Sequence, residues 1–341
     1  MSAIHLKNIP KMQLIVKKFL SLEVNKNRNA MKLLDFYKVF PDEESCEKYL
    51  RYVREKSGIE CRCGCHKMYW NKSKKSWICS SCGHEIRLKS GTVMQNSKLP
   101  LLYWFFAIHL LTATKKSFST REIQHQLGHK RYQPIWEMIH KLRSVMGKRD
   151  DSYELTGSVE IDDGFFSTQM PEDEKDKQLK RGRGSQKKTA VLVMVESKES
   201  DNKQGKSRSV GHLKMKVLPD MSSDSATDIA TDAISLDGKL LSDASTSYHQ
   251  FKDCFMEHSS KVIDKKDIGK VLPWVHVTIS NAKRLLLDIY HDVSAELLQY
   301  YLDEFCYKFN RRYFGDKLFD RLVVAAVSYQ PDFKHRIYSR A

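Results

Sequence analysis

Two sets of residues in this sequence have the types and the spacing that chemistry requires, and the first is a run of cysteines. Cys61, Cys63 and Cys65 are followed by Cys79 and Cys82, so five of the eight cysteines fall within one short segment. Thiolates supplied by two turns bind zinc, and the bound ion can stabilise a segment that is too short to bury a core of its own. The spacing therefore predicts a zinc ribbon.

The first turn of this ribbon leaves a choice of ligands, because its cysteines are separated by single residues. A glycine follows both Cys63 and Cys82, which pairs these two thiols. Cys61 is then the preferred fourth ligand, with Cys65 and His66 as alternatives. Reduced cytosolic thiols or a disulfide cluster are the competing interpretation. The predicted zinc ligands are Cys61, Cys63, Cys79 and Cys82.

The second set consists of carboxylates at the ends of two predicted strands. The segment 158–163 ends in Asp162 and Asp163, and the short strand 239–243 ends in Asp243. Carboxylates that meet in this way can hold two magnesium ions about 4 Å apart, which activate the attacking oxygen and stabilise the leaving oxygen in phosphoryl transfer. Because side chains alternate along a strand, Asp163 is turned away from Asp162. Asp162 and Asp243 are therefore the predicted magnesium ligands.

These acidic residues need a sheet to bring them together, and the surrounding sequence predicts one. Strands are expected at 158–163, 189–195, 212–218 and 239–243, and a helix is expected at 224–234. Successive strands, a helix and a further strand that ends in an acid predict a mixed α/β sheet flanked by helices.

Upstream of this sheet, the sequence predicts helices. The apolar run 99–113 is too short to span a bilayer and is expected to form a buried helix. Ser119–Glu122 reads as a capping box, Gly128 ends the helix that follows, and a second helix begins at Pro134 and stops before Gly147. This is a helix-turn-helix pattern, although amphipathic hairpins also occur in proteins that do not bind DNA. The residues expected to reach phosphates or base edges are Lys130, Arg131, Gln133, His140, Lys141 and Arg143.

Composition and charge indicate the class of partner. The chain has 341 residues, of which 41% are hydrophobic, and this is enough for about two or three domains with cores of their own. The net charge of +16 favours a polyanionic partner, since Lys and Arg neutralise phosphates and release counterions. No apolar run resembles a signal peptide or a membrane span, so we expect a cytoplasmic protein with no membrane partner. The predicted organisation is a helical adaptor at 1–58, the ribbon at 59–98, the helix-turn-helix region at 99–148 and the α/β domain at 149–341.

Further motifs accompany these features. They are Ser90-Gly-Thr, Lys98-Leu-Pro, Trp104-Phe, Val159-Glu-Ile-Asp-Asp163, Ser242-Asp243, Tyr248, Trp274-Val-His276, Ser280-Asn-Ala-Lys-Arg284, Tyr290-His291 and the block from Tyr301 to Arg312. With the ribbon, they make nearly the whole chain resemble bacterial insertion-sequence transposases of the DDE type, which carry an N-terminal zinc ribbon and a ribonuclease-H-like catalytic domain. The first turn of the ribbon is one residue shorter than in that family.

The resemblance implies a recombinase that uses Mg²⁺ or Mn²⁺ at its catalytic site and Zn²⁺ in its ribbon. Such an enzyme binds the terminal inverted repeats of its own mobile element, nicks the DNA and joins the freed 3′-hydroxyls to a target. Its implied partner is double-stranded DNA, both the element ends and the target. Synapsis of two ends further implies a homo-oligomer on the DNA of the nucleoid.

The third catalytic position departs from the pattern of this family, because no acid stands at the expected place before Lys283. His276 lies seven residues before Lys283, and Asn281 lies two residues before it. An amide carbonyl is a hard ligand that suits magnesium, whereas an imidazole suits manganese better and makes the site sensitive to pH. Both residues remain candidates, since family members with a non-acidic third residue are known. Lys283 and Arg284 are expected to hold phosphates near the site.

Two other functions are compatible with the same residues. The incomplete acidic set is what a non-catalytic, zinc-containing DNA-binding regulator derived from such an enzyme would show. A ribonuclease or Holliday-junction nuclease on the same scaffold is the third hypothesis. Near the C-terminal end, Glu304 is expected to cap a helix or pair with Arg311 or Arg312, and Cys254 and Cys306 are expected to be ordinary buried thiols.

Overall fold

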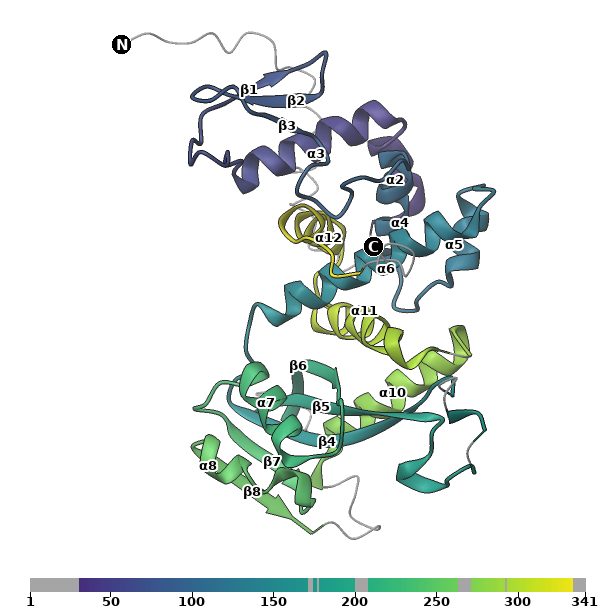
Figure 1. Cartoon of the computed structure of the whole chain (residues 1–341), viewed down its shortest axis with the longest axis vertical. Coiled ribbons are helices and arrows are strands. Elements are labelled where there is room, and N and C mark those ends of the chain that lie inside the picture. Colours follow the sequence, from purple (N-terminus) through teal and green to yellow (C-terminus); the bar gives the residue numbers. More distant parts are fainter. Residues whose placement is uncertain are drawn as a thin grey trace. The chain divides into compact units, whose positions relative to one another are not determined.

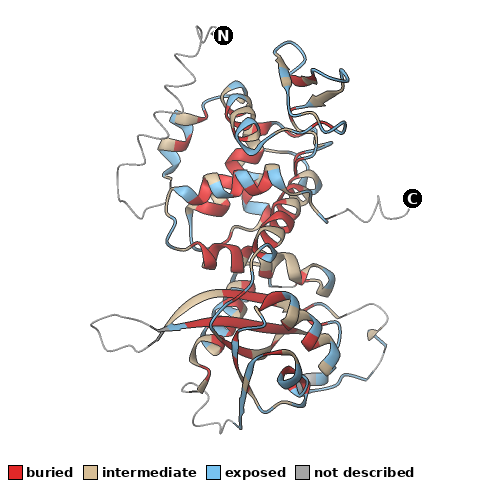
Figure 2. Cartoon of the chain, turned by 90° about the vertical axis from the view of Figure 1, so that its left-hand side faces the viewer, coloured by how far each residue is buried: buried red, intermediate tan, exposed pale blue. Residues whose placement is uncertain are grey.

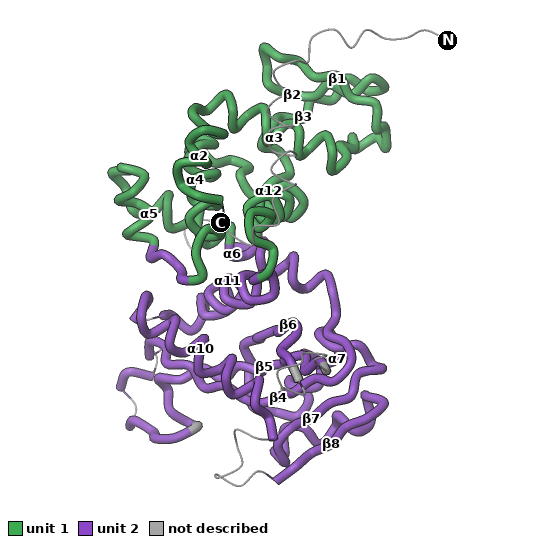
Figure 3. The backbone as a smooth tube through the Cα atoms, turned by 180° about the vertical axis from the view of Figure 1, so that it is seen from behind, with its two compact units in different colours: residues 1–115, 120–142, 313–331 green, residues 116–119, 143–312, 332–341 purple. Residues whose placement is uncertain are grey.

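The structure is a computed structural model that describes residues 31–170, 174–176, 178–199, 208–262, 271–291 and 293–333. The chain divides into two compact units (Figure 3). Unit 1 comprises residues 1–115, 120–142 and 313–331, and unit 2 comprises residues 116–119, 143–312 and 332–341. None of the helices in the described part of the chain combines the length and the apolar character that a bilayer crossing needs.

Unit 1 combines a small antiparallel sheet with several helices (Figure 1). The sheet has the order β1-β2-β3. Its strands are β1 (Met68–Asn71), β2 (Ser76–Cys79) and β3 (Glu85–Arg87). The helices are α2 (Leu33–Val39), α3 (Glu43–Ser57), α4 (Leu101–Ala113), α5 (Thr120–Gln126), the first part of α6 (Tyr132–Asp151) and α12 (Lys317–Ser328).

An aromatic cluster forms the core of the helical part of unit 1. Phe36 of α2, the adjacent Phe40, Phe105 of α4 and Phe319 of α12 are each at most 1% exposed. The ring of Phe40 lies 4.9 Å from that of Phe105 and 5.5 Å from that of Phe319, and burying such rings contributes strongly to stability. The predicted buried helix at 99–113 is therefore confirmed as α4, which packs against α3 and against α12 from the far end of the sequence.

Unit 2 contains a five-stranded mixed sheet with the order β6-β5-β4-β7-β8. Strand β5 is antiparallel to both β4 and β6, whereas β7 runs parallel to β4 and β8 runs parallel to β7. The strands are β4 (Ser158–Ser167), β5 (Lys188–Glu199), β6 (Arg208–Val217), β7 (Lys239–Asp243) and β8 (Glu257–Lys261). The predicted mixed sheet is confirmed: β7 has the expected bounds, β4, β5 and β6 are longer than expected, and β8 is an additional edge strand.

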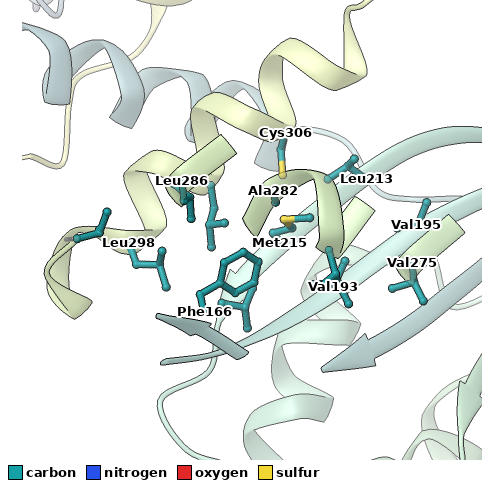
Figure 4. Close-up of a cluster of buried hydrophobic side chains, with 14 of the residues drawn as sticks. Phe166, Val193, Val195, Leu213, Met215, Val275, Ala282, Leu286, Leu298 and Cys306 are labelled. Carbon is teal, nitrogen blue, oxygen red and sulfur yellow. The ribbon is translucent and has the colours of Figure 1, made fainter. Parts of the chain in front are cut away.

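Helices cover both faces of this sheet. One face packs against α10 (Pro273–Ile289) and α11 (Leu298–Asn310) through a cluster that includes Phe166, Val193 and Met215 (Figure 4). The other face packs against α7 (Ser223–Ala233), α8 (Phe251–Cys254) and the 3-10 turn η4 (Thr246–Tyr248). Figure 2 shows the resulting burial of the central strands. Two further 3-10 turns are η3 (Gly182–Gly184) and η5 (Ala295–Leu297).

The second helix of the predicted helix-turn-helix is longer than expected. It does not stop before Gly147 but continues as α6 to Asp151, beyond the expected domain boundary at 148. Gly147 is buried against α11. A Cβ atom at this position would overlap the carboxylate of Asp303 in that helix. The glycine therefore permits a close approach of two helices and does not terminate one.

Candidate catalytic site and cysteine cluster

The two aspartates predicted to bind magnesium lie side by side on neighbouring strands. The parallel register pairs Ile161 of β4 with Ser242 of β7, and Asp162 and Asp243 are the next residues of the two strands. Adjacent strands are about 4.8 Å apart, and residues at equivalent positions point to the same face. That face is the one covered by α10, because Phe166 of β4 belongs to the cluster beneath this helix.

Helix α10 places an imidazole beside the first of these aspartates. The Nδ1 atom of His276 lies 3.3 Å from Oδ2 of Asp162, and the two side chains are 28% and 18% exposed. Burial lowers the pKa of His276, and the charge of Asp243 opposes this shift. The ring is therefore mainly neutral at neutral pH, which is the form that binds metal ions. Its Nε2 atom is buried and has no hydrogen-bond partner among the described residues.

The other candidates for the site lie further along α10. Asn281 is exposed, and five residues of helix rotate it about 140° away from His276. Lys283 is close to two full turns from His276 and is half-buried over the ring of Phe166, 5.6 Å from its centre. Burial and Lys188 lower the pKa of Lys283, against the influence of Asp162. The structure thus groups His276 and Lys283 with Asp162 and leaves Asn281 on another face of the helix.

An open hollow adjoins this group on the outer side of α10. Its volume is about 580 Å³, and Ser280, Lys283, Arg284 and His291 are among the residues that line it. All four side chains can donate hydrogen bonds to a phosphate, and two of them, Lys283 and Arg284, are cations. The hollow could therefore accept a phosphodiester, although the carboxylate of Asp288 also lines it, and Lys283 connects it to the group around Asp162.

Asp163 is held on the opposite face of the sheet. The hydroxyl of Tyr248 donates a 2.7 Å hydrogen bond to its carboxylate, and Tyr248 is 1% exposed. Burial and the neighbouring carboxylate of Asp163 raise the pKa of Tyr248 well above its ordinary value. The tyrosine therefore remains a hydrogen-bond donor at any physiological pH.

The cysteine cluster of unit 1 has the geometry of a metal site. The sulfur atoms of Cys61, Cys63, Cys79 and Cys82 all lie within 4.8 Å of one another, and within the described ranges this is the one group of three or more possible ligands that meets this limit. Sulfurs bound at 2.3 Å around a tetrahedral zinc ion are roughly 3.8 Å apart. The sulfur–sulfur separations of 3.5 Å for Cys61 and Cys82 and 3.6 Å for Cys63 and Cys79 are close to that value. This cluster could bind zinc.

The turns around the cysteines explain how they meet. Gly64 and Gly83 have φ angles of 78° and 70°, which side chains with a Cβ atom rarely adopt. The backbone amide of His84 is the main cause that lowers the pKa of Cys82, to about 7, and this favours the thiolate that binds metal. Cys65 lies apart from the four, with its sulfur 3.6 Å from the hydroxyl of Ser80, and the exposed His66 is also outside the group.

The predicted DNA-contacting residues of the helix-turn-helix divide into two groups. Lys130, Arg131 and Gln133 are exposed and Lys141 is half-buried, so these side chains are accessible. The turn between α5 and α6 is held by Gln124, whose amide donates to the carbonyl of His129 at 2.9 Å.

The prediction of a DNA contact was wrong for Arg143 and His140. Both are 0% exposed, and Nδ1 of His140 lies 3.0 Å from the carbonyl oxygen of Trp136. The guanidinium of Arg143 donates 2.8 Å hydrogen bonds to Glu304 and to the hydroxyl of Tyr290. These contacts satisfy a charge inside the protein and keep it from DNA.

The expected partners of Glu304 were also wrong. Glu304 is 1% exposed and pairs with Arg143, and Lys308 lies 3.8 Å away on the next turn of α11. Burial opposes the ionisation of Glu304, but the two cations outweigh it and lower its pKa. Arg311 instead pairs with the buried Asp150. Cys306 is a buried thiol as expected, whereas Cys254 is half-buried.

Sequence reasoning missed one residue next to the site. Glu160 of β4 is 0% exposed and accepts hydrogen bonds from the backbone amides of Trp274 and Val275, at 2.9 Å and 3.1 Å. Strand alternation could have identified this residue, because Glu160 lies two residues before Asp162 and therefore points to the same face of the sheet. A charged residue in the middle of an apolar strand usually has a buried partner.

The sheet order and the helices that flank the sheet define the fold class of unit 2. Three antiparallel strands continued by two parallel strands, with helices on both faces, form a ribonuclease-H-like fold, and the N-terminal cysteine cluster is consistent with a zinc ribbon. Residues 154–310 match the ISXO2-like transposase domain family. The similarity to insertion-sequence transposases of the DDE type, expected from the sequence motifs, is thereby confirmed.

A relative from Halobacterium salinarum supports the same assignment. It is named an uncharacterized protein in transposable element ISH50, and the two sequences are 23% identical over 174 residues. The match covers 46% of this chain and 55% of the relative, so the chain spans about half the length of the protein that it matches.

Proposed function

We propose that this protein is a DNA transposase that binds the terminal inverted repeats of its mobile element and catalyses metal-dependent strand cleavage and strand transfer. The observation that carries the proposal is the placement of Asp162 and Asp243 at equivalent positions of two adjacent parallel strands, with His276 3.3 Å from Asp162. The transposase-family match of residues 154–310 covers all three residues.

The types of donor atom suit a divalent cation, although Asp162, Asp243 and His276 do not meet the mutual limit of 4.8 Å that the four thiols meet. Both aspartates offer carboxylate oxygens, which magnesium and manganese prefer, and the buried Nε2 atom of His276 has no protein partner among the described residues. A cation pair bound there would activate an attacking oxygen and stabilise a leaving oxygen. The chain itself orients these ligands: Oδ1 of Asp162 accepts from the amide of Asp163 at 2.8 Å, and Oδ1 of Asp243 accepts from the amide of Ser245 at 3.2 Å.

Lys283 and Arg284 are proposed to hold the DNA backbone against this site. Both line the open hollow beside α10, and the half-buried ammonium of Lys283 lies on the side of the helix that also carries His276. In unit 1, the exposed Lys130, Arg131 and Gln133 and the zinc ribbon are proposed to recognise the element ends. We further propose that the active form is a homo-oligomer that joins two ends on nucleoid DNA.

Strand transfer by the purified full-length protein tests this function. With the cognate element ends and Mg²⁺ or Mn²⁺, we expect joined products that disappear with Asp162→Ala or Asp243→Ala. Asp237→Ala is the matched control, because Asp237 is an exposed residue shortly before β7. Binding of the ends without joining under any metal would support the regulator instead, and cleavage of hybrid or branched substrates would support a nuclease.

The same assay decides the third ligand. Because His276 lies beside Asp162 and Asn281 points elsewhere, we expect His276→Ala to abolish joining and Asn281→Ala to retain it. His276→Asp should shift the preference from manganese toward magnesium, since it replaces an imidazole with a hard carboxylate. Loss of joining in Asn281→Ala with retention in His276→Ala would reverse this assignment.

A further inference from the structure

Glu160 is a buried carboxylate in the centre of β4, and the proposed reaction gives it no direct role. It is 0% exposed, and its Oε2 atom accepts hydrogen bonds from the amides of Trp274 at 2.9 Å and Val275 at 3.1 Å. These two amides belong to the first turn of α10, which begins at Pro273.

The first turn of a helix explains why a carboxylate is stable at this place. The leading amides of a helix have no partner inside the helix, and Pro273 has no amide hydrogen, so Trp274 and Val275 carry the first unmatched donors. The positive end of the helix dipole favours a negative charge there. Hydrogen bonds to a charged acceptor are about twice as strong as those between neutral groups, which offsets the cost of burying the carboxylate.

The contact joins the two backbones that carry the proposed metal ligands. Glu160 lies two residues before Asp162 on β4, and Val275 immediately precedes His276 on α10. The distance of 3.3 Å between Asp162 and His276 therefore depends on how α10 is seated on β4. We propose that Glu160 is a positioning residue that fixes the depth and the rotation of α10, so that His276 faces Asp162 and Asp243. This inference rests on the proposed function of the same site.

Apolar packing beneath α10 does not by itself set this geometry. Val275, Ile279 and Ala282 pack against the sheet, but apolar contacts are non-directional and permit small shifts of a helix. Two hydrogen bonds to one oxygen fix the position of the first turn to within the narrow range of a hydrogen-bond distance. Groups that orient metal ligands in this way typically change metal affinity or activity by about 10–100-fold when they are mutated.

Glu160→Gln in the full-length protein tests the inference, and Glu196→Gln is its matched control. Glu196 is also a buried carboxylate of this sheet that accepts from two backbone amides, those of Thr156 at 3.0 Å and His212 at 2.9 Å, and its ion-pair partners, Lys198 and His212, lie outside the proposed ligand set. Both variants should lower the melting temperature. Only Glu160→Gln should also slow strand transfer, by about 10–100-fold, and raise the Mn²⁺ concentration needed for half-maximal rate while end binding stays unchanged.

A second readout separates this inference from the proposed enzymatic function. Mn²⁺ alone should broaden the NMR signals of the His276 ring in the wild type at lower concentration than in Glu160→Gln, whether or not the protein joins DNA. If Glu160→Gln does not fold, Glu160→Asp retains the charge on a shorter side chain and should give the same change in Mn²⁺ requirement. Equal rates and equal Mn²⁺ requirements in the Glu160 and Glu196 variants would overturn the positioning role.

Discussion

Arg143 is completely buried in unit 2, where its guanidinium donates to Glu304 and to Tyr290. Removing one member of a buried ion pair leaves the other charge without compensation, which costs about 3–5 kcal/mol. We expect Glu304→Gln to lower the free energy of unfolding by this amount in urea denaturation. Glu257→Gln is the control, because Glu257 pairs with Lys239 at the surface, where a pair contributes about 0–1 kcal/mol. Equal losses in the two variants would contradict the assignment.

The same arginine shows what the sequence could reveal about single residues. Asp162 and Asp243 were predictable because a strand end and a side-chain alternation are local features of the chain. Arg143 could not be separated from Lys141 in this way, since both are basic residues of one helix and the burial of Arg143 depends on its contact with Glu304 of α11. Glu160 was hidden for a related reason: its partners lie on a helix more than a hundred positions further along the sequence.

At the scale of elements, the contact between α6 and α11 depends on Gly147. A Cβ atom at this position would overlap the carboxylate of Asp303, whose pKa burial raises to about 7. Overpacking of this kind costs about 1–3 kcal/mol, which exceeds the gain of about 1 kcal/mol that alanine brings to an open helix. We therefore expect Gly147→Ala to destabilise the protein in thermal unfolding.

A double mutant separates the steric effect of Gly147→Ala from its effect on helix propensity. Adding Asp303→Ala removes the overlapping carboxylate, so alanine at 147 should then be neutral or stabilising relative to Asp303→Ala alone. Gly184→Ala is a further control, since nothing lies within 4 Å of its Cβ position. Destabilisation that persists in the Asp303→Ala background would show that the overlap is not the cause.

The helices and strands differed in how well they could be predicted from the sequence. Strands β4, β5 and β7 and helix α4 were predicted because apolar runs of the right length are flanked by polar turns. Strand β8 was not, because Glu257–Lys261 is mostly exposed at the edge of the sheet and lacks an alternating pattern. The C-terminal end of α6 was predicted too early, because a glycine commonly ends a helix. Here Gly147 lies inside the helix and allows the close contact with Asp303.

At the scale of the whole molecule, the two units have separate sources of stability. Unit 2 has apolar clusters on both faces of its sheet. The ribbon of unit 1 has strands of only three or four residues, and Trp77 is its one large apolar side chain among the nearly fully buried residues of these strands. The ribbon contacts α3, where the carboxylate of Glu55 accepts a 3.2 Å hydrogen bond from the indole of Trp77. Small segments of this kind typically depend on a bound metal ion to fold, and the four thiols could supply such a site.

We therefore expect zinc removal to unfold the ribbon and leave the sheet of unit 2 intact. Binding of structural zinc contributes about 10–16 kcal/mol in small zinc domains, far more than these three short strands can supply. A chelator should change the fluorescence of Trp70 and Trp77, which lie 4.7 Å apart, and weaken end binding, while the thermal transition of unit 2 keeps its midpoint. Cys79→Ser should lose the zinc, and Cys65→Ser should retain it, because the sulfur of Cys65 lies outside the cluster. Retention of zinc by Cys79→Ser, or its loss from Cys65→Ser, would mean that a different set of ligands holds the ion.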